Sequence, residues 1–430
     1  MLIILALTFH VQGVSIAAEN SAGKQNADNI SQPLRLSLEA AIKRGVDSSS
    51  QLSSIDLSIK KLWRVTNEDK SFKELTAVTQ NELDELDEYY KLSERKTHFD
   101  DLNHYEEDLL VKYRDKYGDA PYYRQTLYEN YLNGRTFSNY SSWLQVLSLK
   151  DSYDTSRAKL EGDIQAMYYN LLYFNEMYQS LEDSLNTMQK QYSGIVLKQE
   201  KGLVSELDRY KFEVELNKKR LQLQKSKRNR EYQELVLKQA CGIERSQAIE
   251  LTSKDAGLNK GHKLDTYKNY LDKALVQRSE VVNAKLQLDV YKQELEYYDK
   301  YIRQQYAFAR TNLQQQLEDA EFAVTQRILN VTSDIQAAYT DARSVQSQLE
   351  IKKRDFQNKE SDYNIAEKKY SQGQLSLIEL WNARGAASNA EIEYKKAQRD
   401  SAYCFHRLEE LACKLGPGYQ SNGANIVSLE

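Results

Sequence analysis

The sequence predicts an all-α protein made of two tandem repeats, each a long antiparallel coiled-coil hairpin of helices. Three observations support this fold class. Of the 430 residues only 3 are Pro and 16 are Gly, so the residues that break helices are scarce. Apolar residues follow one another in alternating steps of three and four, which is typical of coiled coils. Short motifs also recur at one constant spacing, and this indicates an internal duplication.

The first element along the chain is an export signal, predicted over residues 1–18. A short apolar run from Leu2 to Phe9 is followed by Ser15 and Ala17, small residues at the spacing of a cleavage site. The run is too short to cross a bilayer as a helix, and no later segment has about 18 consecutive apolar residues. We therefore expect an exported protein of the cell envelope or periplasm that has no transmembrane helix.

The duplication is visible in three sets of matched positions, listed here in chain order. Asp163-Ile164-Gln165-Ala166 recurs 171 residues later as Asp334-Ile335-Gln336-Ala337, Gly202-Leu203-Val204-Ser205 meets Gly373-Gln374-Leu375-Ser376 at the same spacing, and Asp208 meets Glu379. The constant spacing predicts a first repeat over 34–242 and a second repeat over 265–415. The segment that opens at Leu38 recurs at Leu271, 233 residues later and not 171, so the first repeat carries 62 additional residues, and a divergent insert is predicted at 71–148. A linker over 243–264 joins them, and a disordered tail follows over 416–430.

Each repeat is predicted to turn at the glycine of its second motif. Gly202 and Gly373 can adopt the left-handed conformation that ends a helix without a Cβ penalty. Ser205 and Ser376 follow three residues later, where each can cap the next helix. The acidic residues Asp208 and Glu379 then fall in the first turn of that helix, where negative charge suits the helix dipole.

Two groups of side chains allow more than one interpretation. Cys241 and Cys413 stand at nearly equivalent helix ends, so they form either a disulfide between the repeats or two separate thiols, whereas Cys404 lies in an apolar stripe and is predicted to be core. Tyrosine is concentrated over 113–140, and it suits both an exposed interface belt and packing at one end of the helical layer.

The composition argues against several classes of function. The chain has 63 acidic and 59 basic residues and a net charge of −4, so it offers no basic face to nucleic acid. No Gly-rich phosphate loop, nucleophile elbow or Cys-x-x-Cys pair occurs, and the five His residues lack the spacing of metal ligands. We expect no enzyme activity, no metal site and no cofactor.

The order of motifs resembles that of the TolC-like outer-membrane efflux protein family, the outer membrane factors. Repeats of that family open with a Leu-x-x-Ala segment, as in Leu38-Glu39-Ala40-Ala41 and Leu271-Asp272-Lys273-Ala274. A long helix, a Gly-containing tip turn and a returning helix follow, and the returning helices here end near 237–242 and 408–413. The resemblance covers roughly residues 34–415.

The resemblance implies a homotrimer that closes a long helical tunnel across the periplasm, as the exit duct of an efflux or type I secretion system. The two tip turns would dock a periplasmic adaptor (a membrane fusion protein), which works with an inner-membrane ABC or other efflux transporter. Tyr370 and Glu379 match residues at the family's tunnel entrance, where Asp208 is also expected. Asn382 stands where the family often has a second acid, and Leu375 stands where it can have Arg, so the entrance departs from the family pattern.

A larger departure concerns the β-hairpins that relatives insert into the membrane as a barrel. Residues 274–334 read as helix throughout, with a bend expected near Arg310-Thr311-Asn312, and the acidic middle of the first-repeat insert also reads as helix. Only the segment 136–149 is a candidate transmembrane strand. We therefore expect barrel strands to be reduced or absent. A structural coiled-coil spacer or scaffold of the cell envelope, without a pore, is the competing interpretation.

Overall fold

The structure, a computed structural model of the chain, describes residues 33–66, 72–97, 101–120, 124–202, 204–258, 264–302, 307–411 and 413. The predicted export signal and the predicted tail lie outside the described residues, and so does Leu203 of the first tip motif.

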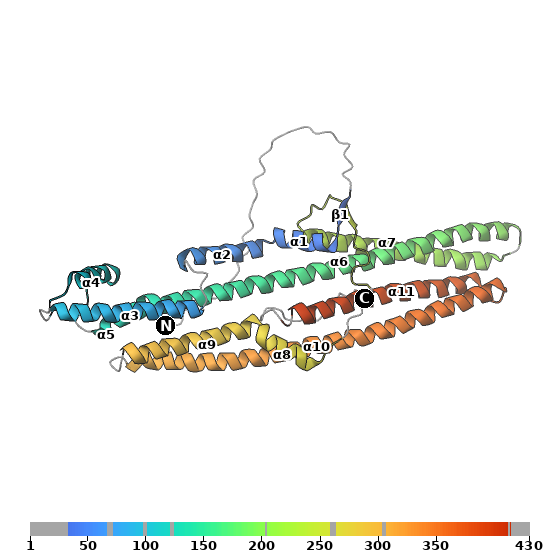
Figure 1. Ribbon diagram of the computed structural model, residues 1–430. Helices are drawn as coiled ribbons and strands as arrows, with labels where there is room; N and C mark the ends of the chain where they lie inside the picture. Colours follow the sequence, from blue (N-terminus) through green and yellow to red (C-terminus); the bar gives the residue numbers. More distant parts are fainter. Residues whose placement is uncertain are drawn as a thin grey trace, which may run out of the picture.

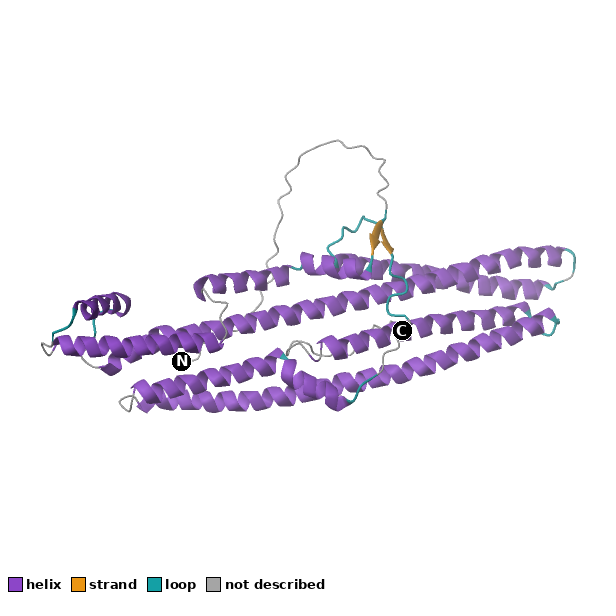
Figure 2. Cartoon of the chain, in the orientation of Figure 1, coloured by secondary structure: helices purple, strands orange, loops and turns teal. Residues whose placement is uncertain are grey.

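Helices make up nearly all of the described chain (Figure 2). The first repeat comprises β1 (Leu34–Leu36), α1 (Leu38–Ser48), α2 (Ser50–Thr66), α3 (Phe72–Thr97), α4 (His104–Tyr117), α5 (Arg124–Tyr131), the π-helical turn η1 (Leu132–Thr136), α6 (Phe137–Glu200) and α7 (Glu206–Ala240). After β2 (Ile249–Leu251), the second repeat comprises α8 (Tyr267–Gln277), α9 (Ser279–Tyr297), η2 (Tyr298–Ile302), α10 (Ala307–Ser371), α11 (Leu377–His406) and η3 (Arg407–Leu411).

The two repeats lie side by side as a thin, elongated layer of helices (Figure 1). Helix α6 pairs with α7, α10 pairs with α11, and α6 packs on α11, so the order across one half of the layer is α7, α6, α11, α10. In the other half the order is α2, α6, α9, α10. The prediction of an all-α fold with two tandem helical hairpins is confirmed.

The duplication is visible in the packing as well as in the sequence. Ile164 and Ile335 correspond in the two repeats, and both side chains are fully buried. The same holds for Leu237 and Leu408 on the returning helices. Each repeat therefore builds its own small core at the base of its hairpin, where the opening short helix packs on the long helix.

The predicted linker contains a strand that the sequence did not suggest. Strand β2 pairs in parallel with β1, and Leu36 lies opposite Leu251. The hydroxyl of Tyr168 on α6 donates a hydrogen bond to the carbonyl oxygen of Leu36 (3.0 Å) and accepts one from the backbone N–H of Ser253 (3.1 Å). Strands of three residues are too short to show the alternation of apolar and polar residues that predicts a strand.

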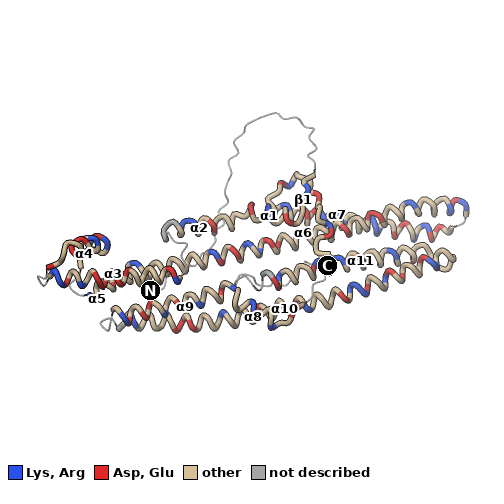
Figure 3. Tube along the Cα trace, viewed as in Figure 1, with Lys and Arg blue, Asp and Glu red and all other residues tan. Residues whose placement is uncertain are grey.

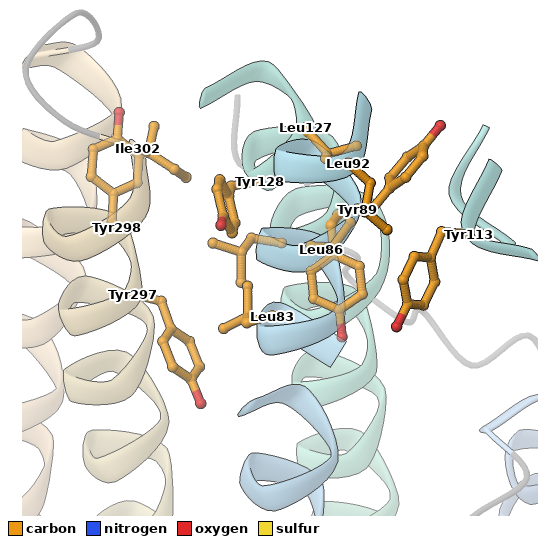
Figure 4. Close-up of a cluster of buried hydrophobic side chains, with 12 residues drawn as sticks. Leu83, Leu86, Tyr89, Leu92, Tyr113, Leu127, Tyr128, Tyr297, Tyr298 and Ile302 are labelled. Atoms are coloured by element: carbon orange, nitrogen blue, oxygen red, sulfur yellow. The ribbon is translucent and has the colours of Figure 1, made fainter. Parts of the chain in front are cut away.

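Helices α3, α4 and α5 form a tyrosine-rich bundle at the end of the layer opposite the tip turns (Figures 1 and 4). Carboxylates of the acidic helix α3 accept hydrogen bonds from tyrosine hydroxyls: Glu88 from Tyr113 (2.7 Å), Glu85 from Tyr117 (2.8 Å), Asp87 from Tyr128 (3.0 Å), and Glu82 from Tyr131. The rings of Tyr128 and Tyr301 stack at 4.9 Å and join the bundle to η2. Packing, rather than an exposed belt, is therefore the role of these tyrosines.

Two predicted features of the segments next to the long helices differ from the structure: a bend and a candidate strand. The bend expected near Arg310-Thr311-Asn312 lies a few residues earlier, because these residues are already in α10 and the chain reverses between η2 and the start of α10 at Ala307. The candidate strand at 136–149 is helical, and it forms the end of η1 and the start of α6. The described parts of the insert and of the segment between α8 and α10 are helices joined by short connections, and the predicted helical character of both regions is confirmed.

The disulfide between Cys241 and Cys413 does not form, because the two residues lie in the separate cores of the two repeats. The thiol of Cys241 instead donates to the carbonyl oxygen of Ala41 (3.5 Å). Cys404 is only partly exposed, in agreement with its predicted place in the core, and burial raises its pKa to about 11.

Acidic and basic residues are interspersed along the helices (Figure 3). Within the described residues, every helix is too short or too polar to cross a membrane.

Candidate functional site

The first tip turn joins α6 to α7. Helix α6 ends at Glu200, and Gly202 adopts φ +74° while its N–H donates to the carbonyl oxygen of Gln199 (2.9 Å). Ser205 then caps α7, since its Oγ accepts from the backbone N–H of Asp208 (3.1 Å) and donates to the Asp208 carboxylate (2.7 Å). The predicted roles of the glycine and the serine are confirmed for this turn.

The second tip turn joins α10 to α11 and has the same design. Gly373 adopts φ +71°, and its N–H donates to the carbonyl oxygen of Tyr370 (2.9 Å). Ser376 and Glu379 form a reciprocal capping box: Glu379 N–H donates to Ser376 Oγ (3.3 Å), and Ser376 N–H donates to the Glu379 carboxylate (2.9 Å). The hydrogen bonds from the Ser376 side chain and backbone hold the pKa of Glu379 below its usual value.

Both tip turns lie at the same end of the molecule (Figure 1). Gly202, Ser205, Gly373, Gln374 and Ser376 are exposed, whereas Val204 and Leu375 are half-buried. A Cβ added at Gly202 or Gly373 would meet no atom within 4 Å, so the turns face open space. The chain thus presents two similar turns with exposed glycine and serine residues at one end of the molecule.

The residues assigned by resemblance to a tunnel entrance do not form one cluster within a single chain. Tyr370 is 40% exposed on α10, and Asn382 is exposed on α11. In the part of the chain that the structure describes, no side-chain hydrogen bond or ion pair joins any two of Asp208, Tyr370, Glu379 and Asn382. The carboxylates of Asp208 and Glu379 instead stabilise the ends of their own helices.

An aromatic contact just behind the tips joins the two hairpins. Trp381 on α11 lies edge-on to Phe212 on α7, with ring centroids 4.7 Å apart, and Phe212 stacks on Tyr192 of α6 at 5.7 Å. The contact between Phe212 and Trp381 is not predicted by the sequence. Their contact is between repeats, and no local pattern reports such a contact.

A buried ion pair fixes the same two hairpins farther from the tips. Arg399 on α11 is 1% exposed, and its guanidinium donates to both carboxylate oxygens of Glu176 on α6 (2.6 and 3.2 Å). It also donates to the carbonyl oxygen of Lys254 in the linker (3.3 Å). The angle between the hairpins, and hence the spacing of the tips, is therefore set by specific contacts.

Comparison with known proteins gives matches by structure alone. No protein-family model and no curated protein matches the sequence. Among solved structures, CusC matches with a TM-score of 0.55 and 12% identity, over 91% of this chain and 95% of CusC. The outer-membrane channel OprN matches with a TM-score of 0.52 and 11% identity, over 91% of this chain and 98% of OprN. The outer membrane protein VceC from Vibrio cholerae matches with a TM-score of 0.47 and 11% identity, over 67% of this chain and 77% of VceC.

CusC and OprN carry the structural argument, because each is matched over nearly its whole length. A shared fold at this level of identity does not by itself fix function. The chain has the fold of the TolC-like outer-membrane channels.

Proposed function

We propose that the protein is an exported exit duct of an efflux or type I secretion system in the cell envelope, and that three copies close its helical wall. It acts as a passive conduit, without chemistry of its own. The observation that carries the proposal is the open layer of helices. Its two edges are not packed on each other within one chain, and both expose apolar side chains.

One edge is formed by α7 in the half of the layer that ends at the tips. Five large apolar side chains on this helix are between 43% and 67% exposed: Leu207, Tyr210, Leu221, Tyr232 and Leu235. At about 100° per residue these positions fall within an arc of roughly 80° on the helix. The stripe therefore has the width of a coiled-coil seam that lacks its partner.

The other edge is formed by α10 along its whole length (Figure 1). Apart from Tyr370 at its tip, five large apolar side chains on this helix are between 49% and 79% exposed: Phe308, Phe322, Leu329, Ile351 and Ile365. These positions fall within an arc of roughly 60° at about 100° per residue. A second seam thus runs along the opposite side of the layer.

Two different edges on one chain favour a ring. When the α7 edge of one copy packs on the α10 edge of the next, the contact is head-to-tail, and head-to-tail contacts close into rings when the rotation between copies permits. The number three comes from the resemblance to the TolC-like family. Helices with one apolar and one polar face suit the wall of a duct, because the apolar face would contact the neighbouring copy while the polar face lines a water-filled lumen.

The tips are the proposed docking site for a periplasmic adaptor. They present exposed turns held by caps, so an incoming helical hairpin would meet a preformed surface. A photo-cross-linker at Gln374 should capture an adaptor with a coiled-coil hairpin in intact cells of the host. The same group at Gln348, midway along α10, is the matched control. Equal capture at both positions, or none at Gln374, would contradict docking at the tips.

A further inference from the structure

A polar groove runs between α6, α9 and α10, remote from the tips. Its volume is about 640 Å³, which lies in the range of sites for small molecules, roughly 300–1,000 Å³. Hydroxyl and amide side chains line much of it, among them Ser141, Gln145, Ser148, Asn283 and Gln287. Because all of the lining comes from one chain, the groove does not depend on the proposed ring.

Charge is compensated at one end of this groove. Glu280 on α9 forms an ion pair with Arg278, which also contacts Asp334 (2.9 Å). Asp151 on α6 accepts a hydrogen bond from Asn283 (2.6 Å), and Arg327 on α10 lines the same region. The carboxylate of Glu280 therefore has a counter-charge within the protein, although neither of its oxygens accepts a hydrogen bond, and the carboxylate of Asp151 has a hydrogen-bond donor.

The other end contains a carboxylate without a partner. Glu294 lies fourteen residues after Glu280 on α9, a separation of about 21 Å along the helix. Its side chain lines the groove and is only 7% exposed. Among the described residues no group donates a hydrogen bond to it or forms an ion pair with it. Burial alone raises the pKa of Glu294 to about 7, and the titratable group that senses its charge, Tyr140 on α6, stays neutral in this pH range.

We propose that the groove binds a small linear amine, whose primary ammonium group pairs with the Glu294 carboxylate. An ammonium group supplies the missing charge and three N–H donors, and a charge-assisted hydrogen bond in a partly dry site is strong. The hydroxyl and amide oxygens along the groove accept the remaining donors. The aliphatic chain then lies along the groove toward the compensated end.

Other ligand classes fit less well. A divalent metal needs several oxygen ligands that converge on one point, and no group of three metal-ligating side chains occurs among the described residues. An anion would be repelled by the negative charge of the Glu294 carboxylate. A cation without N–H groups would leave the acceptors along the groove unsatisfied.

The test is calorimetric titration of the whole chain with butylammonium at pH 8. We expect one site per chain, binding at least tenfold weaker in Glu294→Gln, and unchanged binding in Glu296→Gln, which alters an exposed carboxylate on the same helix. Tetramethylammonium, which has no N–H group, should bind at least tenfold more weakly than butylammonium. Equal affinity for wild type and Glu294→Gln, or no binding of butylammonium at pH 8, would overturn the proposal.

A second readout needs no variant. Because only the ionised carboxylate pairs with the ammonium, the affinity should fall about tenfold from pH 8 to pH 6, as the ionised fraction of a group with pKa about 7 falls from about nine tenths to about one tenth. At pH 7 binding should release about half a proton, measured from the heats in two buffers with different ionisation enthalpies. Binding that is independent of pH and releases no proton would place the amine away from Glu294.

Discussion

At the residue scale, the tip turns depend on backbone conformation more than on side-chain contacts. Gly202 and Gly373 both have positive φ, and a Cβ added at either position would meet no other atom within 4 Å. The serines that follow close each turn by capping the next helix. The turns are therefore stiff because of local geometry, and their outer surface remains available.

Replacing either tip glycine with alanine should destabilise its hairpin by about 1 kcal/mol, because the left-handed conformation costs an L-residue about that much. Gly194→Ala is the matched control: this position is inside α6 and equally open, so the change should stabilise the helix by roughly 0.5–1 kcal/mol. Urea unfolding followed by circular dichroism would measure both. Equal shifts in the two kinds of variant would show that φ does not control the turn.

Arg399→Met should destabilise the protein by about 3 kcal/mol, since it leaves Glu176 without its counter-charge between the repeats. The double variant Arg399→Met with Glu176→Leu should recover much of that loss. Arg157→Met, which breaks an exposed pair within α6, should change stability by less than about 0.5 kcal/mol. If the double variant is no more stable than Arg399→Met, the loss comes from packing and not from the unpaired charge.

At the element scale, α3, α4 and α5 are held together by tyrosine hydroxyls that donate hydrogen bonds to acidic side chains. Helix α3 is acidic, and α4 and α5 provide the tyrosines that its carboxylates bind. Burial and the nearby carboxylates keep these hydroxyls protonated: burial is the larger cause, and the pKa of Tyr117 is raised to about 12. We expect the bundle to lose stability when these tyrosine hydroxyls are deprotonated.

Alkaline pH should therefore loosen this end of the layer first. A tyrosine whose folded pKa lies above the unfolded value of 10.0 favours folding below pH 10, and that contribution is lost as the pH rises toward about 12. Hydrogen exchange measured at increasing pH should show α3–α5 opening while the cores at Ile164 and Ile335 stay protected. Simultaneous opening of both regions would contradict a separate tyrosine-bound unit.

The sequence predicts elements whose signals are local. Three such elements are present in the structure: the turn at Gly202, the cap at Ser205 and the buried Ile164 of the repeated motif. Each is predicted by residues close to it in the sequence. The β1–β2 pairing and the Phe212–Trp381 contact join residues more than 150 positions apart, so no periodicity could report them. The same holds for the groove at Glu294, which needs three helices to be placed first.

At the scale of the whole molecule, the layer is incomplete by itself. The apolar side chains along one side of α7 and one side of α10 remain exposed in a single chain, and each set falls within the width of a helix seam. The proposed ring buries both. We propose that the ring brings together copies of the predicted entrance residues Asp208, Tyr370 and Asn382, which no side-chain contact joins within the described part of one chain.

Leu221→Glu on α7 and Ile351→Glu on α10 should each weaken assembly, because a charge would enter an apolar seam. Gln222→Glu adds the same charge on the neighbouring position of α7 and should leave assembly intact. The concentration at which the assembly dissociates, followed by analytical ultracentrifugation, should rise at least tenfold for the two seam variants alone. An equal rise for Gln222→Glu would mean that net charge, and not the seam, controls association.

The measurement that tests the central claim most directly is the mass of the purified chain in solution, by light scattering coupled to size exclusion. The proposed duct predicts a particle of about three times the 49.9 kDa of one chain. That mass should fall to one chain in the Leu221→Glu variant. A wild-type protein that remains a single chain at every concentration would contradict the duct and favour a structural spacer of the cell envelope.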